Sequence, residues 1–297
     1  MTRTVALLVN PTAGKGRAQR LSGIVVEELT KAGLSVTVLV GANAEEALAL
    51  GHSAVRDGAD ALVALGGDGM VHLALQAVAG TATPLGIIPA GTGNDLANSL
   101  GLPAHAPAAA AAVVADRLLR ADGSPGRAID AVRGAGKWFG CVLGAGFDSR
   151  VNDRANRMSW PRGRMRYNLA ILAELRVFRP LPFRITLDGE LLETEAMLVA
   201  VGNAQSYGAG MRVLPDAVLD DGLLDVCILG PVSKPEFLRT FPKVYKGTHV
   251  RHPAVTIRRA RTVTLEAPDV TAYADGEFFA DLPLSCECVP AAVRVLV

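Results

Sequence analysis

The sequence has little of several features that define specialised protein classes. Four cysteines in 297 residues are too few for a disulfide scaffold, and none forms a CxxC pair typical of zinc sites. Only 5% of the residues are aromatic. Thirty basic residues against 29 acidic ones leave a net charge of +1, which provides no overall field for binding nucleic acid. We therefore expect small buried thiols in a reducing compartment and no nucleic-acid partner.

Long hydrophobic runs are also missing. The only early apolar run, Val5–Val9, has the length of a strand and ends at Asn10-Pro11, well short of the core of a signal peptide. The alanine-rich stretch at 106–115 is too short to cross a bilayer. Half of the residues are nevertheless hydrophobic, so the chain can bury a substantial core. The sequence predicts a soluble, cytoplasmic protein with two domains of ordinary size.

The first part of the chain alternates strand-like and helix-like patterns. Four apolar runs of strand length lie at 5–9, 36–40, 61–65 and 85–88. Apolar residues at helical spacing follow the first two runs, at 21–29 and 44–55. Strands that alternate with helices form βαβ units around a parallel sheet with helices on both faces. We expect a doubly wound, mostly parallel α/β domain over residues 1–125.

A polar break at 122–126 precedes a region with hairpin signals. The turn Asp188-Gly189 lies between two alternating segments, which is typical of a β-hairpin. Helical stretches near 151–178 and 235–245 interrupt the strand candidates. We expect a β-rich, sandwich-like second domain over residues 126–289, with a last strand near 290–297 that returns to the first domain.

Three glycine-bearing turns each follow a predicted strand of the first domain, at 10–16, 66–70 and 89–95. In a parallel sheet such turns gather at the carboxyl ends of the strands, where ligands bind. Glycine lets backbone N–H groups approach an anion closely, and a helix N-terminus adds partial positive charge. No turn has the GK[ST] ending of a P-loop, and the first lacks GxGxxG. The three turns together predict a nucleotide-phosphate site.

Three segments carry a family resemblance: Asn10-Pro11-x-x-Gly14, Gly66-Gly67-Asp68-Gly69 and Gly91-Thr92-Gly93-Asn94-Asp95. In this order and spacing they resemble the diacylglycerol kinase catalytic domain family, which includes bacterial lipid kinases and sphingosine kinases. The resemblance continues through Gly144–Asp148, Ser206–Met211, Pro215–Gly222 and Asp275-Gly276-Glu277, so it covers nearly the whole chain. It implies an ATP-dependent lipid kinase that phosphorylates the hydroxyl group of a membrane lipid, with diacylglycerol as the favoured substrate.

The resemblance assigns nucleotide binding to the first domain and metal and lipid binding to the second. The ATP-binding residues that it implies are Asn10, Pro11, Thr12, Ala13, Gly14, Gly66, Gly67, Asp68, Gly69, Met70, Val71, His72, Thr92, Asn94 and Asp95. The family usually has Thr and Asn where this chain has Met70 and His72, so a non-catalytic, lipid-binding regulatory relative stays an alternative. Because the GGDG sequence also occurs in NAD kinases, an NAD kinase-like enzyme is the other alternative.

Four aspartates, at 216, 220, 221 and 225, lie around Gly222. Hard cations such as Mg²⁺ take carboxylate and carbonyl oxygens, but the spacing alone favours a solvated turn. The resemblance implies that Mg²⁺ is held by the Asp221 carboxylate and by the backbone carbonyls of Val218 and Leu223. It further implies that Asp68 connects to the metal through water.

The triplet Asp-Gly-Glu occurs twice, at 188–190 and at 275–277, and both copies read as hairpin turns. The second lies between Tyr273 and Phe278-Phe279, an apolar setting that partly desolvates a carboxylate and makes it a better base. The second triplet matches the catalytic Asp-Gly-Glu of the family. The resemblance therefore implies Glu277 as the general base, Asp275 in support and Asp68 as a further catalytic residue.

Six arginines crowd into residues 150–166, interleaved with Met158, Trp160 and Met165. Cations beside apolar side chains predict peripheral contact with an anionic membrane surface, and a solvated helix face is the plain alternative. Nothing in the pattern decides the oligomeric state, so a homodimer stays open as a partner.

Overall fold

The computed structural model describes residues 2–10, 17–104, 106–120, 126–161, 164–208 and 210–297. These residues form two compact units. Unit 1 contains Met1–Ala131 and Val289–Val297, and unit 2 contains Val132–Cys288. The chain therefore leaves unit 1 once and returns to it in its last residues.

Unit 1 is built on a parallel sheet. Its strands are β1 (Thr4–Val9), β2 (Ser35–Val40), β3 (Ala61–Gly66), β4 (Leu85–Pro89) and the end of β16 (Leu284–Val295). They lie in the order β2-β1-β3-β4-β16, and each of these pairs is parallel. Strands β1, β3 and β4 are buried along nearly their whole lengths. Their continuous apolar sequences therefore fit a sheet that is covered on both faces.

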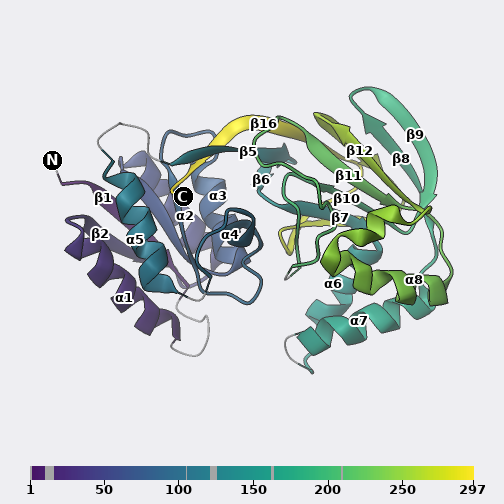
Figure 1. Cartoon of the computed structure of the whole chain (residues 1–297), viewed down its shortest axis with the longest axis horizontal. Helices are drawn as coiled ribbons and strands as arrows, with labels where there is room; N and C mark the ends of the chain where they lie inside the picture. Colours follow the sequence, from purple (N-terminus) through teal and green to yellow (C-terminus); the bar gives the residue numbers. More distant parts are fainter. Residues whose placement is uncertain (1, 11–16, 105, 121–125, 162–163, 209) are drawn as a thin grey trace. The chain divides into compact units, whose positions relative to one another are not determined.

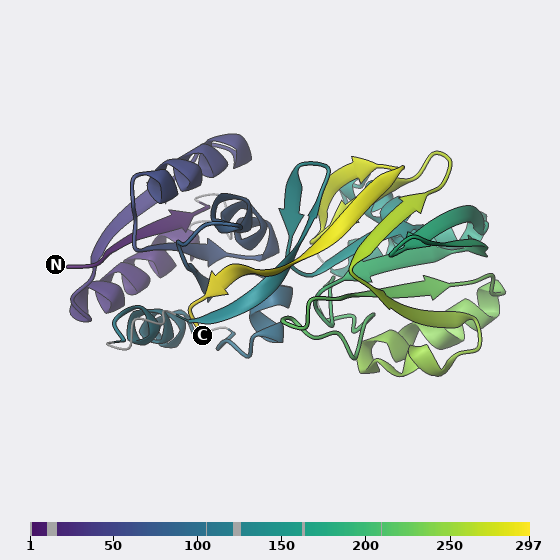
Figure 2. The same ribbon diagram turned by 90° about the horizontal axis from the view of Figure 1, so that it is seen from above.

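Helices lie on both sides of this sheet (Figure 2). They are α1 (Arg17–Lys31), α2 (Ala44–Arg56), α3 (Asp68–Val78), α4 (Asp95–Ser99) and α5 (Pro107–Leu118). Helices α1 and α5 share a buried apolar cluster with one face of the sheet. On the other face α2 packs beside α3, where Gly51 lies close to Leu62 and Ala77. The predicted doubly wound α/β fold is confirmed.

Unit 2 contains two sheets. One consists of β9 (Glu190–Ala196), β8 (Leu181–Leu187), β13 (Thr262–Glu266) and the first part of β16, all antiparallel. The other consists of β12 (Val255–Ala260), β11 (Leu224–Leu229), β10 (Leu198–Gly202), β7 (Val142–Gly146), β14 (Thr271–Ala274) and β15 (Glu277–Asp281). A hairpin of β5 (Arg127–Gly134) and β6 (Lys137–Phe139) adjoins β16. The predicted hairpin around Asp188-Gly189 forms between β8 and β9.

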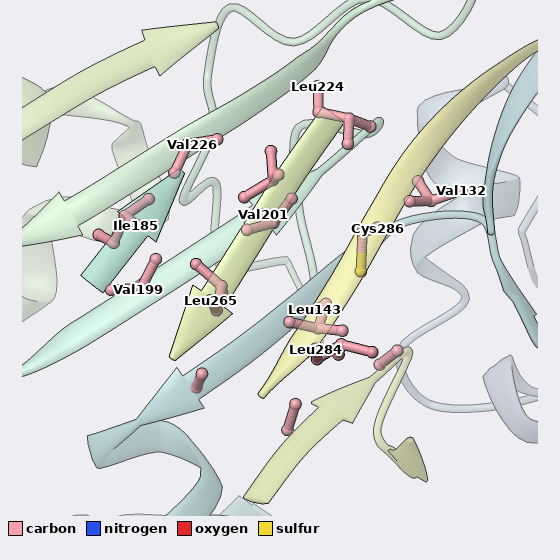
Figure 3. Packing of buried hydrophobic residues seen from close by; sticks show 14 of the residues in the cluster. Val132, Leu143, Ile185, Val199, Val201, Leu224, Val226, Leu265, Leu284 and Cys286 are labelled. Atoms are coloured by element: carbon pink, nitrogen blue, oxygen red, sulfur yellow. The ribbon is translucent and has the colours of Figure 1, made fainter. Parts of the chain in front are cut away.

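The two sheets enclose one apolar core. Ile185 of β8 and Leu265 of β13 lie in it with Val199 and Val201 of β10 (Figure 3). Cys286 and Cys288 point into the same core, because residues two apart on a strand share a face. All four cysteines are free and buried. The prediction of a β-rich, sandwich-like second part is confirmed.

Helices α6 (Phe147–Arg157), α7 (Arg164–Val177) and α8 (Lys234–Thr240) lie together in unit 2 (Figure 1). Two 3₁₀ helices, η1 (Phe241–Lys246) and η2 (Thr248–Arg251), follow α8. The Phe147 ring joins the helices, with its centroid 5.3 Å from that of Phe178 and 5.0 Å from that of Phe237. In the part of the chain that the structure describes, no helix is both long and apolar enough to cross a bilayer.

Candidate functional site

Strands β1, β3 and β4 end at one edge of the unit 1 sheet. Val9 is in register with Leu65, and Gly66 with Pro89, so these strands end side by side. Asn10 follows β1 directly, and the Ala90 N–H donates a hydrogen bond to the Gly66 carbonyl at 2.8 Å. The other residues expected on the first turn, Pro11, Thr12, Ala13 and Gly14, lie outside the described residues.

The turns after β3 and β4 touch through two glycines. A Cβ atom on Gly91 would lie only 2.4 Å from the Cα atom of Gly67, and one on Gly67 would lie 3.1 Å from the Cα atom of Gly91. Neither position has room for a side chain, so the backbones of the two turns pack directly on each other. The glycines therefore expose peptide groups, rather than side chains, where the strands end.

The Asp68 carboxylate joins the same two turns. Its Oδ2 accepts a hydrogen bond from the Asn94 N–H at 2.9 Å, and its Oδ1 accepts one from the Asp95 N–H at 2.6 Å. Asp68 is the first residue of α3, and Asp95 is the first residue of α4. A carboxylate from one helix start thus satisfies the amide groups at the start of the next helix.

Asn94 shapes the second turn. Its backbone is left-handed (φ 56°), a conformation that asparagine adopts more readily than most residues. The Asn94 Oδ1 accepts the Gly91 N–H at 3.0 Å, and its Nδ2 donates to the Gly91 carbonyl at 3.0 Å. Only 3% of Asn94 is exposed, so its side chain holds the turn from inside. Gly91 was expected only as part of a turn, and its close contact with Gly67 gives it a structural role in the site.

Several residues expected to bind the nucleotide have side chains that face the protein interior. Met70, Val71 and His72 are buried on α3, and the His72 Nε2 lies 3.4 Å from the Gln76 Nε2. Any contact these three residues make with a phosphate must therefore come through the backbone at the start of α3. Thr92, in contrast, is exposed at the tip of the second turn.

In unit 2, the second Asp-Gly-Glu triplet forms the tight turn between β14 and β15. Asp275 (φ 52°) and Gly276 (φ 88°) both have positive φ, as a type I′ hairpin turn requires. The Asp275 Oδ2 accepts the Gly140 N–H at 3.0 Å, and its Oδ1 accepts the Cys141 N–H at 2.9 Å. Asp275 therefore ties the hairpin to the segment that leads into β7.

The first triplet is built in the same way. Asp188 (φ 48°) and Gly189 (φ 92°) connect β8 to β9, and the Asp188 carboxylate accepts the N–H groups of Arg261 and Thr262. These bonds lower the pKa of Asp188. In both triplets the aspartate fixes the backbone of a neighbouring segment. The two turns are structural equivalents. They differ chemically in the surroundings of their third residues, Glu190 and Glu277.

The expected apolar setting of Glu277 is wrong. The Glu277 side chain is exposed, and Phe278 is 53% exposed, whereas Phe279 alone turns into the core. The reason is the position of Glu277, which is the first residue of β15, directly after the hairpin turn and on the edge strand of its sheet. Lys137 lies beside this turn, with its Nζ 5.3 Å from the centroid of the Phe278 ring and 2.9 Å from the Phe279 carbonyl oxygen.

The acidic loop before β11 combines exposed and buried carboxylates. The Asp221 Oδ1 accepts the Leu223 N–H at 3.1 Å, and its Oδ2 accepts a hydrogen bond from the Arg259 guanidinium. Asp225, on β11, is only 3% exposed and lies opposite Arg259 on β12, with its Oδ2 3.6 Å from the Arg259 Nε. Burial raises the pKa of Asp225, and the nearby Asp221 and Asp216 add to this effect against the guanidinium.

The carboxylate and carbonyl oxygens of this loop are ligands of the kind that a hard cation prefers. Among the described residues, no three side chains of His, Cys, Asp or Glu come together as a metal site. A set with one carboxylate and two backbone carbonyls, as expected from Asp221, Val218 and Leu223, does not need such a group. The buried Asp225 Oδ2 accepts no hydrogen bond among the described residues, although it forms an ion pair with Arg259. Asp221 and Asp225 share the Arg259 guanidinium, and the negative charge that is left over favours a bound cation.

Sequence reasoning missed a buried carboxyl group next to β7. Asp148 is the second residue of α6, and its Oδ2 would lie 1.5 Å from a Cβ atom on Gly144, so it occupies the space of a missing side chain. The Tyr207 hydroxyl donates to this carboxyl group at 3.3 Å. Burial raises the pKa of Asp148 to about 7. The sequence signal was Gly144-x-Gly146-Phe147-Asp148, in which a glycine on a strand makes room for a later acid.

Both halves of the chain match known families. Residues 4–124 match the family described as diacylglycerol kinase catalytic domain, and residues 141–297 match the family described as YegS C-terminal NAD kinase beta sandwich-like domain. The two matches follow each other along the chain. The first includes the turns after β3 and β4, and the second includes the Asp275 turn and the acidic loop.

Whole-chain relatives are also similar. A protein of Mycobacterium tuberculosis named diacylglycerol kinase is 47% identical over 293 residues, which cover 98% of this chain and 94% of that protein. One of Bacillus subtilis with the same name is 27% identical over 281 residues, covering 93% and 90%. Two crystal structures from Bacillus anthracis str. Sterne each cover 99% of this chain, with TM-scores of 0.80 and 0.75 at 24% and 22% identity. They cover 94% and 96% of those chains.

Proposed function

The chain belongs to the diacylglycerol kinase family. We propose that it transfers the γ-phosphoryl group of ATP to the hydroxyl group of a membrane lipid, with diacylglycerol as the favoured substrate. The observation that carries the proposal is the 47% identity to the Mycobacterium tuberculosis protein over 98% of the chain. The paired turns of unit 1 and the Asp275 turn of unit 2 supply the parts that such a reaction needs.

The paired turns suit the phosphates of a nucleotide. Gly67 and Gly91 keep side chains away from the strand ends, and the start of α3 adds partial positive charge there. A carboxylate next to a phosphate is unfavourable unless other groups use its charge. Asp68 meets this condition because two backbone amides share its oxygens. We assign it to holding the turns in shape around the nucleotide, together with Asn94 and Asp95.

Mg²⁺ would be held by the Asp221 carboxylate and by the backbone carbonyls of Val218 and Leu223. When bound, it would neutralise negative charge on the transferring phosphoryl group or on the loop that supports the site. The excess of carboxylate charge supports this assignment, since Asp221 and Asp225 share the Arg259 guanidinium and a nearby cation would compensate the remaining negative charge. Arg259 shares Asp221 and Asp225 and holds the loop against β12.

Glu277 is our candidate for the general base. A lipid hydroxyl is a very weak acid, so its oxygen needs an acceptor for the proton as it attacks phosphorus. Glu277 follows a turn whose shape Asp275 fixes through the amides of Gly140 and Cys141. Its exposed side chain is free to meet a substrate hydroxyl. We therefore assign the chemistry to Glu277 and the positioning to Asp275.

An NAD kinase-like enzyme is the second candidate. It is favoured by the description of the matching β-sandwich family, which mentions NAD kinase. A shared sandwich carries little weight for substrate choice, since one fold supports many reactions. The whole-chain relatives named diacylglycerol kinase favour the lipid acceptor.

A transfer assay with labelled ATP and Mg²⁺ tests the proposal. Separate vesicles would contain diacylglycerol, monoacylglycerol, a sphingoid base or a polyprenol-like alcohol, and one reaction would contain NAD instead. We expect label in phosphatidic acid, abolished in Glu277→Gln and retained in Glu190→Gln, which rules out a contaminating kinase. Label in NADP alone would support the NAD kinase instead. Lipid binding without any transfer would indicate a regulatory relative.

A further inference from the structure

Helix α7 is apolar on two sides. On one side Ala170 and Leu175 are buried in a cluster with Phe147 and Phe237. On the other side Met165, Leu169 and Leu172 remain 60%, 41% and 52% exposed. These three lie at i, i+4 and i+7, so they form one stripe along the helix. A helix that already has its core face does not need a second apolar stripe for folding, and such a stripe on the surface indicates a binding partner.

An exposed tryptophan extends the apolar surface. Trp160, in the segment between α6 and α7, is 75% exposed. Tryptophan is costly to leave in water and is enriched where proteins meet the interface of a bilayer, because its ring is apolar and its N–H is polar. Met165 begins the stripe five residues later in the chain.

The surrounding charge is strongly positive. Residues 150–179 contain eight arginines and two acidic residues. Both acids have partners within the protein: Asp153 accepts from the Tyr273 hydroxyl, and Glu174 pairs with Arg154. Arg157, Arg176 and Arg179 are exposed. Lys234 adds a cation at the end of α7, where its Nζ donates to the Arg176 carbonyl.

We infer that the outer face of α7, formed by Met165, Leu169, Leu172 and Arg176, docks on an anionic lipid surface together with Arg157 at the end of α6 and Trp160 in the connection before α7. Apolar side chains enter the boundary between headgroups and acyl chains, while the guanidinium groups stay at the level of the phosphates. The inference rests on the proposed function, because it names the surface on which the enzyme meets its lipid. Docking on vesicles without diacylglycerol tests it apart from catalysis.

The charge decides against a second copy of the chain as the partner. A two-fold dimer through this face would place the same patch on both partners, so arginines would face arginines. Like charges across an interface are unfavourable. The apolar stripe decides against nucleic acid, because contacts with phosphates leave Met165, Leu169 and Leu172 without a partner. An anionic bilayer accommodates both the cations and the stripe.

The fluorescence of Trp160 offers a direct readout of contact with a bilayer. The chain contains two tryptophans, so Trp138→Phe leaves Trp160 as the reporter, and Trp160→Phe leaves Trp138 as its control. Each protein would be mixed with vesicles of phosphatidylcholine alone or of phosphatidylcholine with phosphatidylglycerol, without ATP or diacylglycerol. We expect the emission of Trp160 to shift to the blue and to be quenched by brominated acyl chains, with anionic vesicles only. An unchanged Trp160 spectrum on anionic vesicles would overturn the inference.

Vesicle sedimentation with matched variants tests the face itself. We expect Met165→Gln/Leu169→Gln/Leu172→Gln and Arg157→Glu/Arg176→Glu each to lower partitioning onto anionic vesicles about tenfold or more. The controls Leu119→Gln/Leu191→Gln and Lys243→Glu/Lys246→Glu change exposed residues elsewhere, and they should bind as the unmodified chain does. Melting curves and activity on a short-chain diacylglycerol in solution should be equal for all variants.

Other results would contradict the inference. If the Lys243/Lys246 variant loses binding and the two α7 variants keep it, the basic residues of η1 bind the membrane instead of α7. If the triple glutamine variant leaves vesicle binding unchanged and converts a dimer to a monomer in light scattering, a second copy covers this face. If the variants dock as expected but the unmodified chain phosphorylates no lipid, the proposed function fails while the inference stands.

Discussion

The Asp68 carboxylate accepts the backbone N–H of Asp95 at 2.6 Å, although the two residues are 27 positions apart. The same carboxylate also accepts the Asn94 N–H. One acidic side chain thus fixes the geometry between two turns at the strand ends of unit 1. This gives the aspartate of the GGDG sequence a structural task that is separate from any contact with a metal.

Replacing Asp68 should impair both folding and catalysis. Asp68→Ala leaves two amide groups without their acceptor, so we expect a loss of about 2 kcal/mol in the free energy of unfolding. The displaced turns should lower kcat roughly 10²-fold or more, because small errors in substrate position are costly. Urea unfolding and steady-state kinetics measure the two effects.

An ordinary helix cap supplies the control for Asp68. The Asn43 Oδ1 accepts the Glu46 N–H at 2.8 Å at the start of α2. Asn43→Ala should cost ~1 kcal/mol of stability and leave kcat unchanged. If Asp68→Ala behaves in the same way, the residue is only a cap and its role in the site is refuted.

Gly91→Ala should separate the paired turns. The added Cβ atom would lie 2.4 Å from the Gly67 Cα and 3.0 Å from the Asn94 Oδ1, so the backbone must move. We expect ~1–3 kcal/mol of destabilisation and a raised KM for ATP. Gly23→Ala on α1, where nothing lies within 4 Å, should instead add ~0.5–1 kcal/mol of stability. Equal nucleotide affinity in Gly91→Ala and the unmodified chain would show that the turn contact is dispensable.

Glu277→Gln should separate chemistry from turn structure. The substitution keeps the size of the side chain but removes its basic oxygen, so we expect kcat to fall roughly 10²–10⁴-fold. The KM for ATP should stay the same. Glu190→Gln, at the same place in the equivalent first triplet, should retain full activity. Normal turnover of the Glu277 variant would exclude this residue as the base.

The buried Asp148 carboxyl group should make stability depend on pH. Because burial raises its pKa to about 7 from a reference value of 3.8, the folded state keeps a proton that the unfolded state releases. Its contribution is present below the unfolded pKa and is lost as pH rises through the folded pKa. Although the carboxyl group is buried, the Asp148 residue as a whole is partly exposed, so we expect Asp148→Asn to be more stable than the unmodified chain at about pH 8 by only on the order of 2 kcal/mol.

Urea unfolding across this pH range measures the effect. Near pH 3, below the unfolded pKa, position 148 is neutral in the folded and unfolded states of both proteins, so this group contributes no difference in their free energies of unfolding. The difference should grow as the pH rises from about 4 to about 7 and then stay constant. Parallel curves for the two proteins would mean that Asp148 is already ionised in the folded state.

The parts of the fold that the sequence predicts are those with local signals. The strand before Asn10 and the hairpin at Asp188-Gly189 have clear periodicity or turn chemistry, and both occur as expected. Strand β7 has the sequence VLGAG, in which glycine hides the pattern of a strand. Its glycine content has a tertiary cause, because Gly144 makes room for Asp148.

The candidate site, like the fold, could be predicted only where its signals are local in the sequence. The glycine turns could be placed at one sheet edge from strand order alone, but the pairing of Asp68 with Asn94 and Asp95 depends on how two turns fold over each other. Exposure of Glu277 depends on the position of β15 at the edge of its sheet, which composition does not reveal. The Asp225–Arg259 pair requires the register of two strands that are 25 residues or more apart in sequence.

Strand β16 has a consequence for how the protein is made. Val295 pairs with Leu85 of β4, and the Leu296 N–H donates to the Leu85 carbonyl at 2.9 Å. A ribosome that has released the first 131 residues has not yet synthesised this last piece of unit 1. Until residues 289–297 are synthesised, the edge of β4 stays open to pairing with another nascent chain. Unit 1 therefore cannot be completed before all of unit 2 has been translated, and slow synthesis of unit 2 would favour aggregation over completion.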